Sequence, residues 1–177
     1  FAAYLVHTGQ HYDEAMSSGY SAQWSKAISK ELNSLNENSV YTVVDRPPDQ
    51  PVLGGRYTFK VKETATGLVS RFKARYVAKG FLQEIYVNYN ITYSPVCRAV
   101  SVRCIWARSM SMGWRTYSAD VTTDFLYAPL MEEVYVEAPK GSNTPAGKCW
   151  RLHRCLYGLR QSPSSWAREV TKAMTSI

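Results

Sequence analysis

The sequence predicts a mixed α+β fold, and three patterns support that prediction. Apolar residues recur at helical spacing over residues 21–37, and a second helical pattern covers about 99–112, where Gly113 ends it. Between them, 57–62 and 71–76 alternate between apolar and charged side chains, as half-buried strands do. Together these patterns indicate helices and strands in one chain segment.

The clearest helix begins at Ser21 and is expected to end near Asn38. Trp24, Ile28 and Leu35 fall on one face, so this face should pack on the protein through the Trp24 indole. Residues 1–20 carry little pattern and are expected to form a lead-in that need not be ordered. Shorter elements are expected as strands at 40–44, 133–137 and 148–152, and as a helix beginning at Ser162 and Pro163, because proline suits a first turn.

A basic β-hairpin is predicted over residues 56–79, with its turn at 65–67. The period of two places the charged side chains of each strand on one face. A solvated charged face is one explanation of such a cluster, and a ribbon that grips phosphate is the other. The sorting of the charges favours the phosphate-binding ribbon. The cations of this region are Arg56, Lys60, Lys62, Arg71, Lys73, Arg75 and Lys79, against one acid, Glu63.

Composition narrows the function classes. The chain has 177 residues, enough for one sizeable core or part of a larger domain, and its first residues lack the basic start of a secretory signal, as in a segment of something longer. No apolar run approaches the roughly 20 residues that a membrane helix needs. The four cysteines show no CxxC spacing, which predicts reduced core thiols in an intracellular protein. The net charge of +7 favours a polyanionic partner.

A carboxylate stands inside a strand-like run at Asp120. Tyr117, Ala119 and Val121 alternate with polar residues, so a strand is predicted there. Burying an unpaired charge costs several kcal/mol, so an aspartate in such a place is usually a cap, a turn former or a metal ligand. This stretch alone does not decide between capping and metal binding.

Four separated motifs stand in order along the chain. They are RFKARYVAKGF at 71–81, YSPVCR at 93–98, DVTTDFL at 120–126, and LYGLRQSP at 156–163 with Trp166 after it. Together they resemble the reverse transcriptase of copia-type LTR retrotransposons. The resemblance covers about residues 12–175. Each motif alone is weak, and their occurrence in register makes the resemblance specific.

The resemblance implies a right-hand polymerase, of which this chain holds the fingers and the first part of the palm. Residues 21–98 would form a fingers-like region that contains the basic hairpin. Residues 99–177 would form a partial palm, with an incomplete antiparallel sheet packed on helices, truncated before the family's Asp-Asp turn. The implied activity is RNA-directed DNA polymerisation by two-metal nucleotidyl transfer with Mg²⁺.

The resemblance also implies partners and a location. The partners would be an RNA or DNA template with its primer, deoxynucleoside triphosphates (dNTPs), and the integrase and RNase H regions of a Pol polyprotein. The location would be intracellular, in a cytoplasmic particle or the nucleus, with no membrane involved.

Single residues receive roles from the same resemblance. Asp120 matches the first catalytic carboxylate, and with the backbone of Val121 it would bind metal. Phe125 matches the bulky position beneath the sugar that rejects a 2′-hydroxyl, although core packing also explains an aromatic residue there. Tyr157 and Gly158 match the turn that borders the nucleotide, where an ordinary turn glycine is the alternative. The nucleotide-binding set is Lys73, Arg75, Val121, Phe125, Tyr157 and Gly158, and the nucleic-acid-binding set is Lys60, Lys62, Arg71, Lys79, Arg160 and Gln161.

Several positions depart from the family pattern. Asp124 stands near the expected triphosphate, where a small residue is usual and a carboxylate would repel the substrate. Tyr86, Asn88 and Ala128 replace a usual Gly, Asp and Gly, and the chain contains no adjacent aspartates. Two other interpretations therefore stay open. One is a degenerate, inactive retroelement remnant that at most binds nucleic acid, and the other is a structural interaction module, against which the sorted basic hairpin argues.

Overall fold

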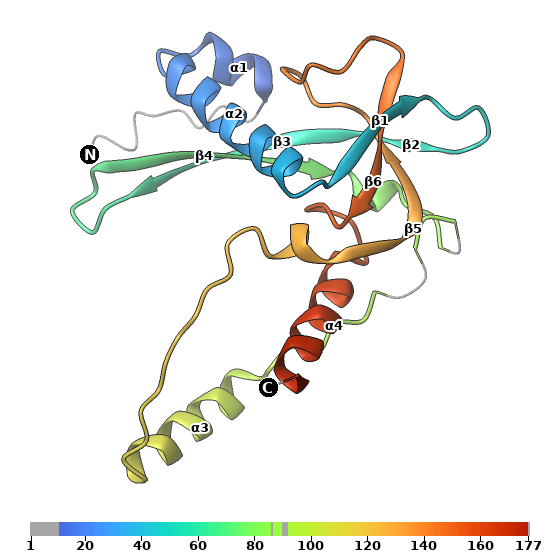
Figure 1. Ribbon diagram of the computed structural model, residues 1–177. Coiled ribbons are helices and arrows are strands. Elements are labelled where there is room, and N and C mark those ends of the chain that lie inside the picture. Colours follow the sequence, from blue (N-terminus) through green and yellow to red (C-terminus); the bar gives the residue numbers. More distant parts are fainter. Residues whose placement is uncertain (1–10, 86, 90–91, 177) are drawn as a thin grey trace.

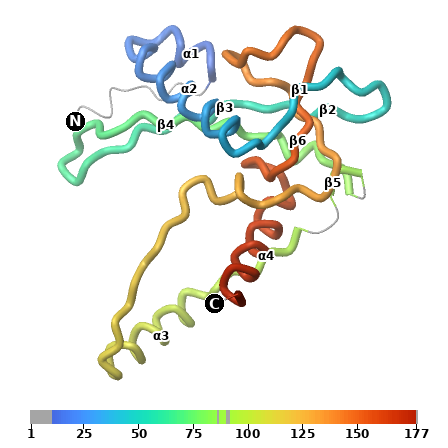
Figure 2. The backbone as a smooth tube through the Cα atoms, viewed as in Figure 1, coloured from blue at the N-terminus to red at the C-terminus, as the bar shows by residue number. Residues whose placement is uncertain are grey.

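The computed structural model describes residues 11–85, 87–89 and 92–176 of the chain. Its elements in chain order are α1 (Tyr12–Ser17), α2 (Ser21–Glu37), β1 (Tyr41–Asp45), β2 (Val52–Leu53), β3 (Gly55–Glu63), β4 (Val69–Ala78), the 3₁₀ helix η2 (Gly80–Leu82), α3 (Ala99–Ser111), the 3₁₀ helix η3 (Asp124–Tyr127), β5 (Pro129–Val136), β6 (Lys148–Arg154) and α4 (Ser162–Thr175). Figure 1 shows a body of strands flanked by α1, α2 and α4, while α3 stands apart from it. The backbone trace in Figure 2 shows the long extended segment, 114–121, that returns from α3 to the body.

Two sheets form the body. The larger has the strand order β1-β6-β5-β2, and the smaller is the β3–β4 hairpin. β6 pairs antiparallel with both β1 and β5, whereas β2 pairs with β5 in parallel, so the sheet is mixed where an antiparallel sheet was expected. The reason is local: β2 has two residues, which leave no periodic signal in the sequence, and it reaches β5 through the proline-rich loop after β1.

The register of the hairpin separates charged from apolar side chains. Lys60 lies opposite Lys73 and Lys62 opposite Arg71, and directly opposed residues share a face, so the predicted basic face is confirmed. The other face carries aromatic side chains. Trp24 of α2 packs edge-on against Phe59 and Phe72 there, with ring centroids 5.0 and 4.6 Å apart. α2 therefore covers the apolar face and leaves the basic face open.

A buried carboxylate also ties α2 to β4. Glu31 is 6% exposed, and its Oε1 accepts a hydrogen bond of 3.1 Å from the backbone N–H of Tyr76. This bond gives the backbone N–H of a buried residue a partner. Burial raises the pKa of Glu31, although the Tyr76 hydrogen bond and the cations Arg75 and Lys73 act in the opposite direction.

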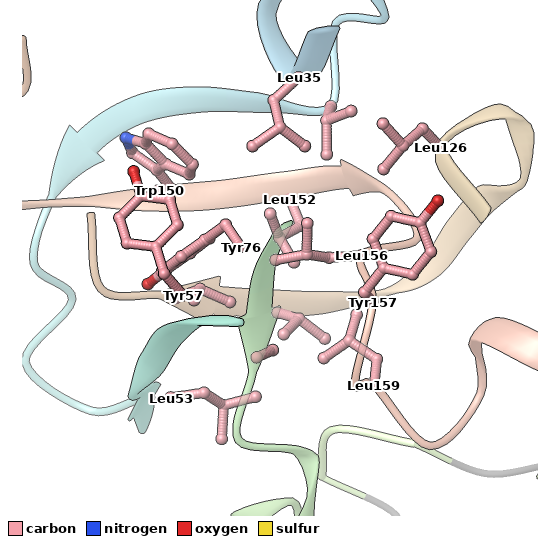
Figure 3. Packing of buried hydrophobic residues seen from close by; sticks show 14 of the residues in the cluster. Leu35, Leu53, Tyr57, Tyr76, Leu126, Trp150, Leu152, Leu156, Tyr157 and Leu159 are labelled. Atoms are coloured by element: carbon pink, nitrogen blue, oxygen red, sulfur yellow. The ribbon is translucent and has the colours of Figure 1, made fainter. Parts of the chain in front are cut away.

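The main core lies between the larger sheet and the hairpin, as Figure 3 shows. Trp150 stacks on Tyr41 at a centroid distance of 3.6 Å and meets Tyr76 edge-on at 5.8 Å. Leu156 and Leu159, in the turn after β6, are buried in the same cluster. This packing fixes the turn against the hairpin.

The predicted strand around Asp120 is absent. Residues 114–121 are extended but belong to neither sheet of the described chain, and the next element is η3. Alternation predicts strand conformation, whereas a strand also needs a neighbour to accept its hydrogen bonds. The segment has the predicted conformation without such a neighbour.

The N-terminal lead-in contains a helix that the sequence did not reveal. α1 occupies residues 12–17, where Ala15 is buried and the Tyr12 ring stacks on Tyr57 at 5.8 Å. Its six residues are too few to establish a helical period. Residues 1–10 of the expected lead-in, and Tyr86, lie outside the described residues.

Two of the four free thiols agree with the expected core location. Cys149 and Cys155 are buried, whereas Cys97 and Cys104 are exposed because they belong to α3 and the segment before it. Over the residues that the structure describes, none of the helices combines the length and apolar character needed to cross a membrane.

Candidate nucleotide and nucleic-acid site

Three segments far apart in the sequence meet at one tyrosine. The Arg75 guanidinium of β4 lies over the ring of Tyr157, 4.6 Å from its centroid, and the Phe125 ring of η3 packs edge-on against it at 5.3 Å. The Tyr157 hydroxyl donates a hydrogen bond of 3.3 Å to Asp124 Oδ1. We call Arg75, Asp124, Phe125 and Tyr157 the Tyr157 cluster. It unites three residues predicted to bind nucleotide with the unexpected carboxylate.

Close backbone contact fixes the position of Tyr157. Its carbonyl accepts a hydrogen bond of 2.8 Å from Ala78 N–H at the end of β4. Gly158 has φ +91°, and a Cβ there would lie 2.2 Å from the Ala78 carbonyl oxygen. A Cβ on Gly80 would likewise lie 2.0 Å from the Gly158 carbonyl oxygen. Gly158 thus permits close approach as expected, and here the approach is to the protein's own backbone.

Burial controls the ionisation of the cluster. It raises the pKa of Tyr157 to about 12, with Arg75 opposing the shift and Asp124 adding to it. The hydroxyl therefore stays protonated at neutral pH and can donate to Asp124. Burial, followed by the neighbouring cations Arg75, Lys62 and Arg71, lowers the pKa of Lys73.

The cations of the hairpin face are available to a ligand. Five other cations of the chain have a carboxylate within 4.0 Å. Within the described ranges, no carboxylate lies that close to any of five cations of the hairpin: Lys60, Lys62, Arg71, Lys73 and Arg75. Lys60, Lys62 and Arg71 are exposed, while Lys73 and Arg75 are partly buried. Lys79 lies past the end of β4, where its N–H donates to Gly54 O at 2.8 Å. It therefore does not extend the hairpin face.

Buried hydrogen bonds join the turn after β6 to the loop that contains Gln83 and Asn88. Gln161 is 1% exposed; its Nε2 donates to Asn88 O at 2.9 Å, and its Oε1 accepts from Gln83 Nε2 at 3.0 Å. Gln83 Oε1 in turn accepts from the Arg160 N–H at 2.8 Å. The Gln161 amide is thus occupied within the protein and does not face a ligand. The sequence motif could not reveal that Gln161 is a buried structural residue, because its partner Gln83 is 78 residues away in the sequence.

Arg160 braces the same loop at the surface. Its Nε donates to Gly80 O at 2.9 Å, and its guanidinium lies 5.2 Å from the centroid of the Tyr89 ring. The residue is nevertheless exposed, and its contact with nucleic acid stays a prediction.

Asp120 and Val121 are both exposed on the extended segment after α3. No three His, Cys, Asp or Glu side chains in the described part of the chain are grouped closely enough to hold a metal ion. Mg²⁺ prefers six oxygen ligands, including carboxylates and substrate phosphates. The described residues therefore do not form a Mg²⁺ site by themselves, and Asp120 could supply one ligand of it.

Comparison with known proteins decides the family. A family model described as reverse transcriptase (RNA-dependent DNA polymerase) matches residues 38–177. The chain belongs to the reverse transcriptase family. The predicted resemblance to the copia-type branch is confirmed by the relatives of this reverse transcriptase segment.

The Pol polyproteins among these relatives are far longer than this chain, which spans only 11–12% of their length. It is 33% identical over 165 residues to the retrovirus-related Pol polyprotein from transposon TNT 1-94 of Nicotiana tabacum, covering 92% of this chain and 12% of that protein. It is 32% identical over 159 residues to the Pol polyprotein from transposon RE2 of Arabidopsis thaliana, covering 88% and 11%. It is also 42% identical over 82 residues to an uncharacterized mitochondrial protein of Arabidopsis thaliana, covering 46% and 48%. No solved structure matches it.

Proposed function

We propose that this chain supplies the fingers and the first part of the palm of an RNA-directed DNA polymerase, within a copia-type Pol polyprotein. The observation that supports this most directly is the position of Arg75. It belongs both to the unpaired basic face and to the Tyr157 cluster, and so joins two groups of residues that the family resemblance assigns to nucleic acid and nucleotide.

The basic face would hold phosphate groups of the template and of the incoming dNTP. Charge-assisted hydrogen bonds suit phosphate oxygens, and the guanidinium of Arg75 adds a planar fork. The Tyr157 ring beneath that guanidinium would restrict its motion through a cation–π contact. Phe125 is half-buried, so it can pack on Tyr157 and still border a sugar.

Polymerisation would also need metal ions and further residues. Reverse transcriptases use divalent metals, and Asp120 is the residue here that matches a catalytic carboxylate of the family. Because the described residues hold no complete metal site, we propose that the chain on its own is inactive. The template, primer and polyprotein partners, and the intracellular location, are part of the same proposal.

One observation favours the alternative of a non-catalytic remnant. The Asp124 carboxylate shares Tyr157 with Arg75, so a negative charge stands at the edge of the phosphate-binding face. A charge in this position would weaken triphosphate binding more than binding to an extended nucleic-acid backbone, which can use the outer hairpin cations.

The proposal is tested by the salt dependence of binding to a primer–template duplex. Removing two phosphate contacts with Lys73→Ala and Arg75→Ala should reduce the slope of log affinity against log salt by about 1.8. The matched control is Lys26→Ala with Lys30→Ala, two exposed lysines on α2. The control should leave the slope unchanged. An equal change in both double variants would show that the hairpin is only a solvated charged face.

A further inference from the structure

A cavity of about 380 Å³ opens on the aromatic side of the hairpin, between α1, the start of β3 and the end of β5. Tyr57 and Tyr76 line it, and both belong to the face that is turned away from the basic row. The volume lies in the range of small-molecule sites. The cavity is therefore separate from the Tyr157 cluster.

The walls of this cavity are fixed by hydrogen bonds. The Tyr76 hydroxyl donates to Glu137 O at 2.6 Å, and the Tyr57 hydroxyl donates to Lys140 O at 3.1 Å. A Cβ on Gly55 would lie 1.9 Å from the Tyr76 hydroxyl, so any side chain at this position would break the first of these bonds. Because the hydroxyls are occupied, the tyrosines present ring surface in a preformed wall.

The charged side chains around the cavity include unpaired cations but no unpaired acid among the described residues. Both acids that line it are already paired: Glu137 with Arg46, and Asp13 with Lys140 at 2.7 Å. Lys79 and Arg56 also line it, and neither has a carboxylate within 4.0 Å in the described part of the chain. The unpaired charge is therefore positive.

Lys79 is held in place at the cavity. Its backbone N–H donates to Gly54 O, and its side-chain stem lies close enough to Gly54 that an added Cβ would be 3.3 Å from Cδ. The missing side chain at Gly54 leaves room for this stem. The adjacent glycines Gly54 and Gly55 thus serve two different parts of the same wall.

We propose that this cavity is a second site for phosphate-bearing ligands, in which Lys79 and Arg56 bind the phosphate and the tyrosine rings border the rest of the ligand. Two free cations suit the oxygens of a phosphate group, and the arginine can bind two of them at once. A free nucleotide and a nucleic-acid strand both carry this group. The site does not use the Tyr157 cluster, and from the row of β3 that carries Lys60 and Lys62 it uses only Arg56, at the start of the strand, so it goes beyond the proposed function.

The test is a titration of the ¹⁵N-labelled 177-residue chain, followed by the amide resonances of Gly54, Gly55 and Ala138. The probes are inorganic phosphate, deoxyadenosine monophosphate and a short oligodeoxyadenylate. We expect saturable shifts at these amides, and a dissociation constant at least tenfold larger for Lys79→Ala. Shifts with the monophosphate identify a free nucleotide as the source, and shifts with the oligonucleotide alone identify a strand; either supports the site.

Matched variants keep the result interpretable. Lys30→Ala, which removes a charge from the exposed face of α2, should change the dissociation constant less than twofold. Arg56→Ala serves as a second test if Lys79→Ala does not fold. No saturable shift at the three amides with any probe, or equal weakening by Lys30→Ala, would overturn the proposal. Because shifts at Tyr157 and Gly158 are recorded separately, failure of this site is distinguished from failure of the proposed function.

Discussion

Gly158 combines a positive φ with close contact to the backbone of β4. Its φ of +91° is unfavourable for any other residue, and a Cβ would lie 2.2 Å from the Ala78 carbonyl oxygen. We expect Gly158→Ala to lower the free energy of unfolding by roughly 2–4 kcal/mol in urea denaturation. Gly67→Ala is the control, because φ is +77° there and nothing lies within 4 Å of the added atom. Its cost should be about 1–2 kcal/mol; equal costs would show that the contact with β4 is unimportant.

Tyr157 should make the protein sensitive to alkaline pH. Burial raises its pKa from 10.0 to about 12, so between these values the unfolded chain loses the proton while the folded protein keeps it. Stability is therefore complete below pH 10 and falls as pH rises to 12, by about 2.7 kcal/mol for this residue. Tyr157→Phe should lose about 1 kcal/mol at pH 7, with the hydrogen bond to Asp124, and decline less above pH 10.

The measurement for Tyr157→Phe is the free energy of unfolding at a series of pH values. Tyr117→Phe is the control, since Tyr117 is 88% exposed and should leave the pH profile unchanged. Parallel profiles for the wild type and Tyr157→Phe would contradict the assigned role of burial.

The resemblance singled out candidate residues for the site but not their arrangement. Arg75, Phe125 and Tyr157 were each singled out by motif position, yet only the folded chain shows that the first two contact the ring of the third. Gln161 was predicted to contact nucleic acid from the same motif, and it is buried. Burial depends on the Gln83 loop packing beneath the turn, and no local pattern records that contact. The individual site roles stay predictions.

At the level of elements, periodicity predicted the longer helices and strands and missed the short or unpaired segments. α2 and the hairpin were predicted correctly because periods of 3.6 and 2 are written in adjacent residues. The strand at Asp120, the two-residue β2 and the six-residue α1 were not, because they depend on a partner strand or are too short to show a period. The errors therefore arise where an element depends on distant parts of the chain or is too short to show a period.

α3 is expected to be less stable than the body of the protein. Val100, Ile105, Trp106 and Met110 on it are all exposed, and a helix of 13 residues without packing is marginal in water. We expect its amide protons to exchange roughly 100-fold faster than those of β4 in a hydrogen-exchange experiment on the folded chain.

Replacement of residues 99–113 by a Gly-Ser linker checks the same prediction from the other side. The urea midpoint of the body should be unchanged, because the core cluster contains no residue of α3. Exchange of α3 as slow as that of β4, or loss of the body's unfolding transition in the linker variant, would show that α3 is packed on the body.

On the scale of the whole molecule, the described residues combine an open basic face with no group of three side chains that could hold a metal ion. Two Mg²⁺ ions held close together repel one another unless several carboxylates surround them, and Asp120 matches the family pattern alone. We therefore expect no primer extension on an RNA template with Mg²⁺. Activity should require a chimera that adds a downstream segment carrying the family's Asp-Asp turn.

The chimera should also need Asp124→Ala. The Asp124 carboxylate accepts the Tyr157 hydroxyl beside Arg75, so it would oppose a triphosphate bound there, whereas alanine removes that charge. Primer extension is compared between the chain, the chimera and the chimera with Asp124→Ala, each with an Asp120→Asn control. We expect primer extension only by the chimera with Asp124→Ala, and we expect Asp120→Asn to abolish it. The asparagine amide cannot replace a charged metal ligand. Polymerisation by the unextended chain, or by a chimera that carries Asp120→Asn, would therefore show that Asp120 is not the catalytic carboxylate.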